Sequence, residues 1–366
     1  MPKARKSAVV EPVHQPAHFF EKQLAGEQPP TLDTMKRLYG EAARFFGFAP
    51  WEIFSDQHLV LLEDPISKEI CYCSIMGALG EVFSLHAYIG AESYRFFKRV
   101  EEGEEVTPHD AFSVLRGVSV EFVTLSELTA PDKELLRAMR HPLRRGSKAP
   151  IFRAYRPGYQ PWHVTEPEAI TLAECVEAAN ALFIELLKYK DLSYWNGPDL
   201  YPFMVPGSGP KSKNYEIKKV NAPHPPAAAP PLIEVDQARV RRLQEKDYVL
   251  KGAFEADHFY TGSVIGGKNE RKAFAHAAFI LDAASGFLFR PELGEASHSV
   301  GDILARVVLN AIEDASFLPA ELRVKKDEFK TLLEPLAQQL GITVQVAKSL
   351  PAVERAKKHL FEFLGR

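Results

Sequence analysis

The sequence predicts a two-domain α+β protein in which each domain combines a β-sheet with covering helices. The chain has 366 residues, which is more than one ordinary hydrophobic core needs and suits two. Proline, glycine and alanine accumulate between residues 203 and 231 and end in the string PHPPAAAPP, a composition typical of an extended spacer. On both sides of this spacer, apolar residues recur with the periods of strands and of helices.

These observations divide the chain into four segments. Residues 1–30 are rich in proline, alanine and charge without sustained periodicity, which predicts a flexible N-terminal arm. Residues 31–202 form the predicted N-terminal domain, an antiparallel sheet with helices. Residues 203–231 form the predicted linker, although the run Asn214–Val220 within it could still form a strand packed on the first domain. Residues 232–366 form the predicted C-terminal domain, with a mixed α/β sheet.

The first domain is expected to begin with a helix and to continue as an antiparallel meander. Apolar side chains recur every three or four residues from Leu32 to Phe46, and Gly47 is a natural end for this helix. Another long helix is expected from Thr165 to Leu187. Between them lie apolar runs separated by proline and glycine turns. These predicted strands are residues 58–62, 69–76, 82–89, 119–125 and 151–155.

The second domain is expected to carry three strands followed by alternating helices and strands. An order of three strands and then α-β-α-β-α is typical of a mixed sheet with helices on its faces. The predicted strands are residues 248–262, 273–281, 287–289, 321–324 and 342–346, and the predicted helices cover residues 300–312, the segment after Asp327, and residues 353–364.

Charge and cysteine content limit the classes of function. The formal net charge is -3, so the whole chain has no field that would attract nucleic acid or an anionic membrane. Apolar runs stay well short of the roughly 20 residues that a membrane-spanning helix needs. The three cysteines fit a reducing compartment, so we expect a cytoplasmic protein. Cys71 and Cys73 lie on one expected strand without metal ligands at suitable spacing nearby, and we expect them to be buried and inert.

A basic and aromatic segment is one candidate binding surface. Arg144 and Arg145 precede Tyr159 and Trp162, which lie in the turn-rich string RPGYQPWH. Arginine side chains match phosphate, and aromatic rings offer stacking platforms for bases. The same residues also suit a solvated loop with a structural tryptophan. His163, next to Trp162, is interpreted as a structural histidine rather than a general base.

Acidic residues on the first strand of the second domain are another candidate site. Glu255 and Asp257 alternate along the string FEADHFY and therefore share one strand face. His258 is expected on the opposite face, with His276 on the next strand. Neighbouring carboxylates can hold Mg²⁺ or share a proton. On a solvated face they would have no such role.

Two stretches of the chain resemble bacterial families of unknown function. The strings WEIF at 51–54, SIMGALGEVFSLHAYIG at 74–90 and PGYQPW at 157–162 resemble one such family. The strings ILDAASGFL at 280–288 and LPAELRVKKDEFKTLLEPLAQQLGI at 318–342 resemble a second family that often follows the first. Neither resemblance implies a known activity, ligand or catalytic residue.

The order of elements in the second domain is more remotely similar to the ribonuclease H-like fold of integrases and transposases. That resemblance implies a set of carboxylates for two metal ions, with Glu255 or Asp257 on the first strand and Glu354 on the final helix. The middle acid is missing, because Lys325 and Lys326 follow the strand at 321–324. Asp327 comes two residues late, which is roughly 6–7 Å along an extended chain. The catalytic set therefore looks incomplete.

These observations favour a non-catalytic binding or regulatory protein of uncharacterised function. The expected partner is a protein or a small ligand rather than nucleic acid or a membrane. The alternative is a metal-dependent nuclease or phosphotransferase of ribonuclease H-like type. Its cofactor would be Mg²⁺ or Mn²⁺, and its candidate residues are Glu255, Asp257, Asp327 and Glu354.

Overall fold

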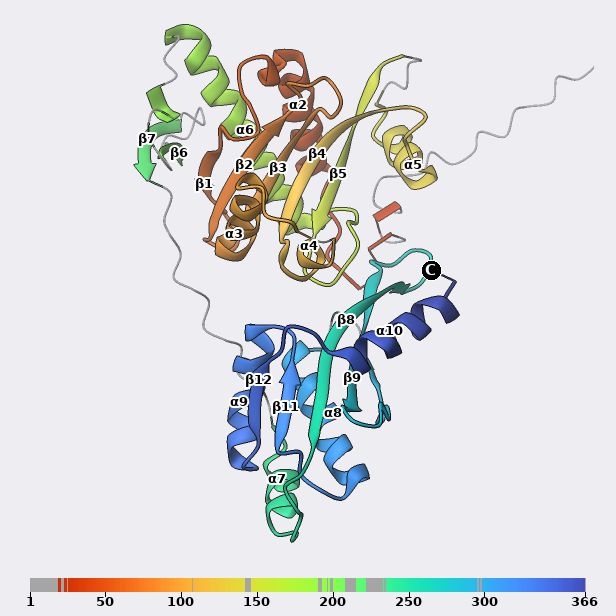
Figure 1. Cartoon of the computed structure of the whole chain (residues 1–366). Coiled ribbons are helices and arrows are strands. Elements are labelled where there is room, and N and C mark those ends of the chain that lie inside the picture. Colours follow the sequence, from red (N-terminus) through yellow and green to blue (C-terminus); the bar gives the residue numbers. More distant parts are fainter. Residues whose placement is uncertain are drawn as a thin grey trace, which may run out of the picture. The chain divides into compact units, whose positions relative to one another are not determined.

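The computed structural model of the chain divides into two compact units (Figure 1). One unit consists of Met1–Pro225 with Gly267–Arg271, and the other of Pro226–Gly266 with Lys272–Arg366. The structure describes residues 19–20, 23–24, 26–106, 108–141, 146–189, 193–195, 197, 200–207, 215–221, 233, 235–294, 296 and 298–365.

The described residues of the first unit form a seven-stranded sheet with the strand order β5-β4-β3-β2-β1-β6-β7. Strands β1 to β5 are an antiparallel meander, and β6 pairs antiparallel with β7. Only the pairing of β1 with β6 is parallel within this sheet. The strands are β1 (Val60–Glu63), β2 (Ile70–Met76), β3 (Ser84–Ile89), β4 (Gly117–Thr124), β5 (Lys148–Tyr155), β6 (Leu200–Pro206) and β7 (Tyr215–Asn221).

Helices cover both faces of this sheet. Two of them, α2 (Leu32–Phe48) and α6 (Glu166–Tyr189), pack their apolar residues on one face and form the main core with Cys71, Cys73 and Cys175. On the other face, Tyr94 of α3 stacks on Tyr72 of β2, with ring centroids 4.1 Å apart. The other helical segments are η1 (Pro50–Glu52), α3 (Gly90–Glu101), α4 (Pro108–Val114), α5 (Ala130–Ala138) and η2 (Ser193–Trp195).

Local sequence signals explain where α2 begins and ends. The hydroxyl of Thr31 accepts a hydrogen bond from the Thr34 amide and caps the first turn. The helix runs past Gly47, the predicted end, to Phe48, and Ala49 takes the left-handed conformation with φ 49°. Pro50 then prevents further helix. The apolar stripe predicted from the sequence is therefore correct, and the end of the helix was placed slightly early.

The predicted N-terminal arm is partly wrong. Phe19 and Phe20 are buried in the first core, with exposed fractions of 0% and 1%. The backbone oxygen of Gln23 accepts a 2.6 Å hydrogen bond from the indole nitrogen of Trp162. The amide of Glu166 donates to the oxygen of Gln28. Two adjacent phenylalanines bury enough apolar area to order this short segment. Residues 1–18 lie outside the described residues.

The predicted linker contains two strands of the first sheet. Strand β6 overlaps the predicted start of the linker, and all of β7 lies inside the predicted range 203–231. Pro202 and Pro206 are tolerated within β6 because the pairing of β6 with β1 is short and does not include them. It joins Leu61 with Phe203 and Leu62 with Met204. Residues 222–232, which include the string PHPPAAAPP, lie outside the described residues.

The second unit has a five-stranded mixed sheet with the order β10-β9-β8-β11-β12 among its described residues. Strands β8, β9 and β10 are antiparallel neighbours, whereas β11 lies parallel to both β8 and β12. The strands are β8 (Ala253–Ile265), β9 (Ala273–Asp282), β10 (Glu292–Gly294), β11 (Glu321–Val324) and β12 (Thr343–Val346). The short β10 replaces the strand predicted at 287–289, where Leu288 makes only an isolated bridge to Leu281.

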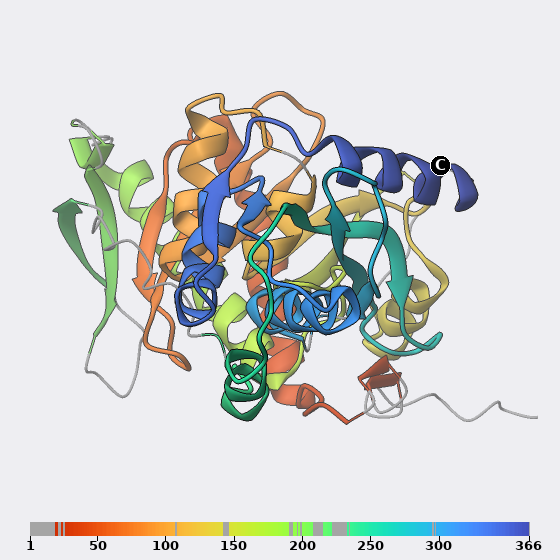
Figure 2. The ribbon, with the colours of Figure 1, turned by 60° about the horizontal axis from the view of Figure 1, so that its bottom comes forward.

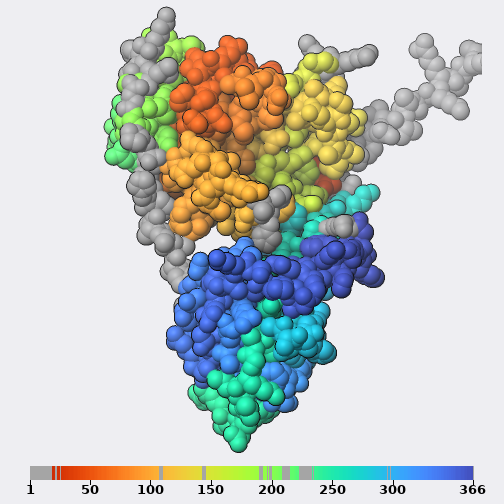
Figure 3. All heavy atoms as spheres, in the orientation of Figure 1, coloured from red at the N-terminus to blue at the C-terminus, as the bar shows by residue number. Residues whose placement is uncertain are grey.

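Helices also cover both faces of the second sheet. Three helices pack on one face, and α10 packs on the other with Phe259 and Phe279. Figure 2 shows α8 and α10 on opposite sides of the strands, and Figure 3 shows α10 at the surface of this unit. The helices are α7 (Gln237–Gln244), α8 (Val300–Ala315), α9 (Asp327–Gln339) and α10 (Pro351–Phe363). The prediction of a two-domain α+β protein is confirmed.

Every helix in the described part of the chain is too short or too polar to cross a bilayer.

Replacing Phe20 by Ala should destabilise the first unit by about 3–5 kcal/mol, the usual cost of removing a buried phenylalanine ring. The three tryptophans of the sequence, Trp51, Trp162 and Trp195, all lie in the first unit, so denaturant unfolding followed by tryptophan fluorescence measures this change. Leu79→Ala is the control because Leu79 is 90% exposed. Equal unfolding midpoints for the two variants would show that residues 19–20 do not belong to the core.

Candidate functional site

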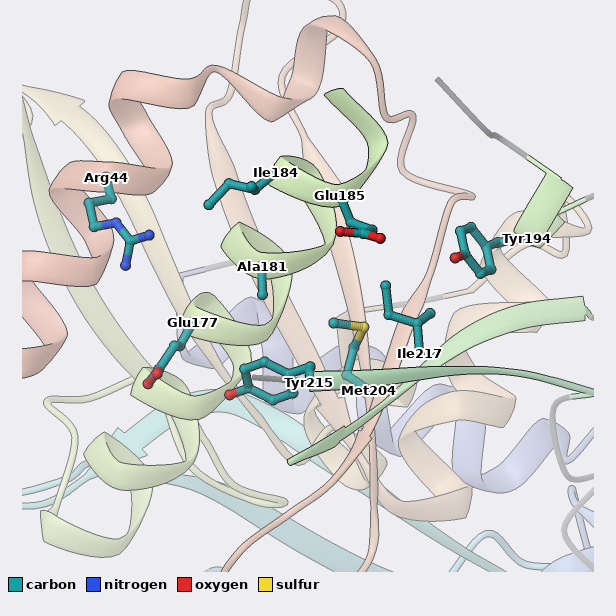
Figure 4. Close-up of a pocket in the computed structure, with 9 residues that line it drawn as sticks. All are labelled: Arg44, Glu177, Ala181, Ile184, Glu185, Tyr194, Met204, Tyr215 and Ile217. Carbon is teal, nitrogen blue, oxygen red and sulfur yellow. The ribbon is translucent and has the colours of Figure 1, made fainter. Parts of the chain in front are cut away.

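A pocket of about 540 Å³ lies in the first unit beside the edge strand β7 (Figure 4). Its volume is within the range of small-molecule sites, about 300–1,000 Å³. Five elements contribute side chains: α2, α6, η2, β6 and β7. The lining residues are Arg44, Glu177, Ala181, Ile184, Glu185, Tyr194, Met204, Tyr215 and Ile217.

Helix and strand periodicities place these side chains in one cavity. The lining residues Ala181, Ile184 and Glu185 of α6 follow Glu177 by four, seven and eight positions and therefore lie on the same side of the helix. Tyr215 and Ile217 alternate on one face of β7, and Met204 of β6 is the Cα partner of Ile217. Figure 4 shows apolar side chains in the middle of the pocket, with Glu177 near Tyr215 on one side and Glu185 near Tyr194 on another.

A polar network holds β7 against the two helices beneath the pocket. The hydroxyl of Tyr215 donates a 2.7 Å hydrogen bond to one oxygen of Glu174. The other oxygen of Glu174 accepts a 2.7 Å hydrogen bond from Arg37 of α2, and Arg37 also pairs with Glu177. Burial and the bond to Glu174 raise the pKa of Tyr215. Burial lowers the pKa of Arg37, but the hydrogen bonds that Arg37 donates to Glu174 and Glu177, together with their negative charges, outweigh this effect and raise the pKa.

The charged groups that line the pocket differ in whether they are paired. Arg44 donates to both oxygens of Glu41, at 2.9 and 3.1 Å, and its guanidinium lies 5.8 Å from the centre of the Phe48 ring. Glu177 is paired with Arg37. Within the described residues, Glu185 forms no hydrogen bond or ion pair. Glu185 is therefore the charged lining group that the surrounding described side chains leave without a partner.

The side chains that line the pocket are aromatic, apolar and charged. Its described lining residues include no Ser, Thr, Cys or His, the side chains that most often supply a nucleophile or a general base. The two tyrosines offer aromatic faces and the carboxylate of Glu185 accepts hydrogen bonds. The arrangement can hold an amphipathic organic molecule in a fixed orientation.

The structure places Glu255 and Asp257 on the face of β8 that packs against α10, and both are buried. One oxygen of Glu255 accepts hydrogen bonds from the amides of Ala352 and Val353, at 2.8 and 3.1 Å. Glu255 thus satisfies the free amides at the start of α10 and interacts favourably with the helix dipole. Asp257 forms an ion pair with Lys357 of the same helix. Both carboxylates are occupied by structural contacts.

The other two acidic candidates, Glu354 and Asp327, make separate contacts from those of Glu255 and Asp257. Glu354 is exposed and its carboxylate accepts a 3.4 Å hydrogen bond from the Leu350 amide of its own helix. Asp327 is the exposed first residue of α9, and its backbone oxygen accepts a hydrogen bond from Thr331. Among the described residues, no group of three or more His, Cys, Asp and Glu side chains is arranged to hold a metal ion.

The histidines near these acids lie as the strand pattern predicts. His258 points to the opposite face of β8 from Asp257, because its ring contacts Phe329 of α9. Its Nε2 lies 2.6 Å from Nδ1 of His276 on β9, and both rings are buried. This buried pair belongs to the core that the second sheet forms with α8 and α9.

The basic and aromatic candidate surface is only partly described. Arg144 and Arg145 lie outside the described residues. Tyr159 is half-buried in a turn, and its backbone amide donates a hydrogen bond to the backbone oxygen of Arg156. Trp162 is half-buried against the first core, and its indole nitrogen donates to Gln23. The described part of this surface therefore shows a tryptophan with a structural role.

Sequence reasoning missed every residue of the pocket. Glu177, Ala181 and Glu185 occur in a helix that the sequence predicts, but their polar stripe resembles an ordinary solvated face. Tyr215 and Ile217 fall in a segment assigned to the linker. The run Asn214–Val220 is recognisable as a possible strand of the first domain, but its sequence carries no indication of a cavity.

A buried histidine stands out on the other face of the first sheet. The ring of His86 on β3 is 7% exposed and lies between Tyr88 and Tyr155, at centroid distances of 4.4 and 4.7 Å. Its Nε2 has no hydrogen-bond partner among the described residues. Burial lowers the pKa of His86 to about 4. Gly117 on β4 leaves space for this ring, since a Cβ there would lie 3.1 Å from Nε2.

The comparisons with known proteins match the chain in two parts. Residues 36–196 match the model of a family described as Domain of unknown function (DUF7309). Residues 239–361 match the model of a second family, Domain of unknown function (DUF6930). No curated protein sequence matches the chain.

One solved structure with similarity to the chain is entitled "CryoEM structure of simian T-cell lymphotropic virus intasome in complex with PP2A regulatory subunit B56 gamma". The similarity covers 37% of this chain and 44% of that chain, at 10% identity and a TM-score of 0.20. The chain therefore spans less than half the length of the structure that it matches. Similarity at this level establishes neither a shared fold nor a shared function.

His86 should make the first unit sensitive to acid. Its pKa in the folded protein lies below the ordinary value of 6.5, so the unfolded state binds the proton more readily. The folded state is therefore fully stable with respect to this group above pH 6.5, where His86 is neutral in both states. It loses stability as the pH falls towards 4, because the unfolded state takes up the proton first. This single group should account for about 3 kcal/mol of the free energy of unfolding.

The measurement is urea unfolding at pH 7 and pH 4.5, followed by tryptophan fluorescence. His86→Phe should lose less stability on acidification than the wild type. His359→Gln, which changes an exposed histidine of the second unit, should behave as the wild type does. An equal acid-induced loss in His86→Phe and wild type would exclude His86 as the source.

Proposed function

We propose that the chain is a non-catalytic binding protein and that the pocket beside β7 is its ligand site. The observation that carries this proposal is the pocket itself: about 540 Å³, lined by two tyrosines, apolar side chains and the unpaired Glu185. The network of Arg37, Glu174 and Tyr215 supports it, because rigid walls reduce the entropy lost on binding.

The expected location in a reducing compartment agrees with this proposal. All three cysteines are free and buried. Burial raises the pKa of Cys73, which makes its thiol a poor nucleophile. We therefore assign the cysteines to the core of the first unit and regard the cytoplasm as the place where the ligand is bound.

A metal-dependent nuclease or phosphotransferase remains the alternative function. It is favoured by the order of elements in the second unit, in which the strands β8, β9 and β10 precede α8, β11, α9, β12 and α10. Three strands followed by alternating helices and strands is the order on which the resemblance to ribonuclease H-like enzymes rests. The alternative would require Glu255 and Asp257 to leave α10 and bind Mg²⁺ or Mn²⁺.

Filling the pocket should abolish ligand binding. The sequence contains five methionines. Met35 and Met204 are both buried in the first core, but of these two only Met204 is among the described residues that line the pocket. Titration with 2-phenylethanol, a small neutral amphipathic probe, should therefore shift the methyl NMR signal of Met204 in protein labelled with [methyl-13C]methionine. The signal of Met35 should not change.

Ala181→Trp should remove this shift, because the indole would occupy the cavity. Ile184→Trp is a second pocket-filling variant, and Ile184 is 43% exposed and therefore tolerant of change. Leu79→Trp is the control for an added surface tryptophan. A Met204 signal that does not respond in the wild type, or that still responds in both pocket variants, would contradict the proposed site.

Glu255→Ala distinguishes the two functions. If Glu255 only caps α10, the variant should lose about 1–3 kcal/mol of local stability, and the amides of Ala352 and Val353 should exchange faster by hydrogen-exchange mass spectrometry. Glu362→Ala, at an exposed position of the same helix, is the control. Calorimetry of the wild type should detect no Mg²⁺ or Mn²⁺ binding. Metal binding that Glu255→Ala abolishes would favour the nuclease.

A further inference from the structure

The charge distribution of the pocket indicates which ligands it would accept. Arg44 is paired with Glu41, and Arg37 is shared between Glu174 and Glu177, so these side chains leave no excess of positive charge at the pocket. Glu185 is the charged lining side chain that has no partner among the described residues. Glu185 is half-buried, so water screens its charge less than that of a fully exposed side chain. An anionic ligand would be repelled, and a cationic ligand would supply the missing partner.

The aromatic side chains strengthen this preference. Tyrosine rings attract cations through their quadrupole, in addition to offering apolar area. Tyr194 lies near Glu185 in Figure 4, so a cation at this end of the pocket would meet a carboxylate and an aromatic ring together. The hydroxyl of Tyr215 already donates to Glu174, which leaves the ring of Tyr215 as its contribution to the pocket.

The rest of the cavity determines the body of the ligand. Between the two polar ends lie Ala181, Met204 and Ile217, and Met204 is fully buried. These side chains can contact a hydrocarbon or aryl group but offer no hydrogen bonds to it. A ligand that is polar along its whole length would lose hydrogen bonds to water without replacement.

We infer that the ligand of this pocket is a small organic amine, whose ammonium group pairs with Glu185 beside Tyr194 and whose apolar body lies against Ala181, Met204 and Ile217. This inference rests on the proposed function, since it names the ligand class of the same pocket. Arg44 does not oppose the binding of a cation, because Glu41 holds its guanidinium.

The test compares three probes that share one aromatic body and differ in charge. They are 2-phenylethylamine, which is cationic at pH 7, 2-phenylethanol, which is neutral, and phenylacetate, which is anionic. Each is titrated into the wild type at low ionic strength while the methyl NMR signal of Met204 is recorded. The amine should bind about 3–10-fold more tightly than the alcohol, as expected for one half-buried ion pair with an aromatic neighbour. Phenylacetate should bind most weakly.

Glu185→Gln should remove the preference for the amine over the alcohol, because the amide that replaces the carboxylate carries no charge. Glu81→Gln, which changes an exposed acid outside this pocket, should keep the preference for the amine. Raising the salt concentration should reduce the preference in the wild type.

The outcomes separate the two claims. Equal binding of amine and alcohol to the wild type, or a preference that survives in Glu185→Gln, would overturn the amine inference and leave the pocket as a ligand site. A Met204 signal that responds to none of the three probes would overturn the proposed function itself.

Discussion

The hydrogen-bonded ion pairs of Arg37 with Glu174 and Glu177 are the interaction on which the candidate site depends. Arg37 comes from α2 and both glutamates come from α6, so the pairs join the two helices that cover one face of the first sheet. Glu174 is buried and also accepts from Tyr215 of β7. Without this connection, the edge strand would have no polar anchor beside the pocket. The same helix, α6, then carries Glu185 to the other end of the cavity.

Helix α6 therefore contributes one face to the main core and another face to the pocket. One face is apolar and lies in the main core, with residues such as Leu172, Val176 and Leu182 fully buried. The other face carries Glu174 and Glu177, which pair with Arg37, and Glu185, which lines the pocket without a partner among the described residues. Because both faces belong to one hydrogen-bonded helix of 24 residues, the core that fixes one face also fixes the position of the other.

The second unit shows how a suggestive set of acids can serve structure alone. Glu255 and Asp257 share a strand face, which is the pattern expected of metal ligands, but α10 packs on that face and uses both carboxylates. Their positions were predictable, whereas their partners were not. A buried carboxylate needs donors or a cation, and the start of α10 with Lys357 supplies both.

The sequence by itself determined the two sheets, most of the helices and strands, and the face assignments of Glu255, Asp257 and His258, because these follow from local periodicity and turn residues. It could not show that Phe19 and Phe20 belong to the first core or that Tyr215 belongs to its sheet. Those facts depend on contacts with residues more than one hundred positions away, such as Trp162 with Gln23 and Tyr201 with Leu59 in one apolar cluster. The pocket is decided only by tertiary structure, since its walls come from five elements and its character depends on which charges find partners.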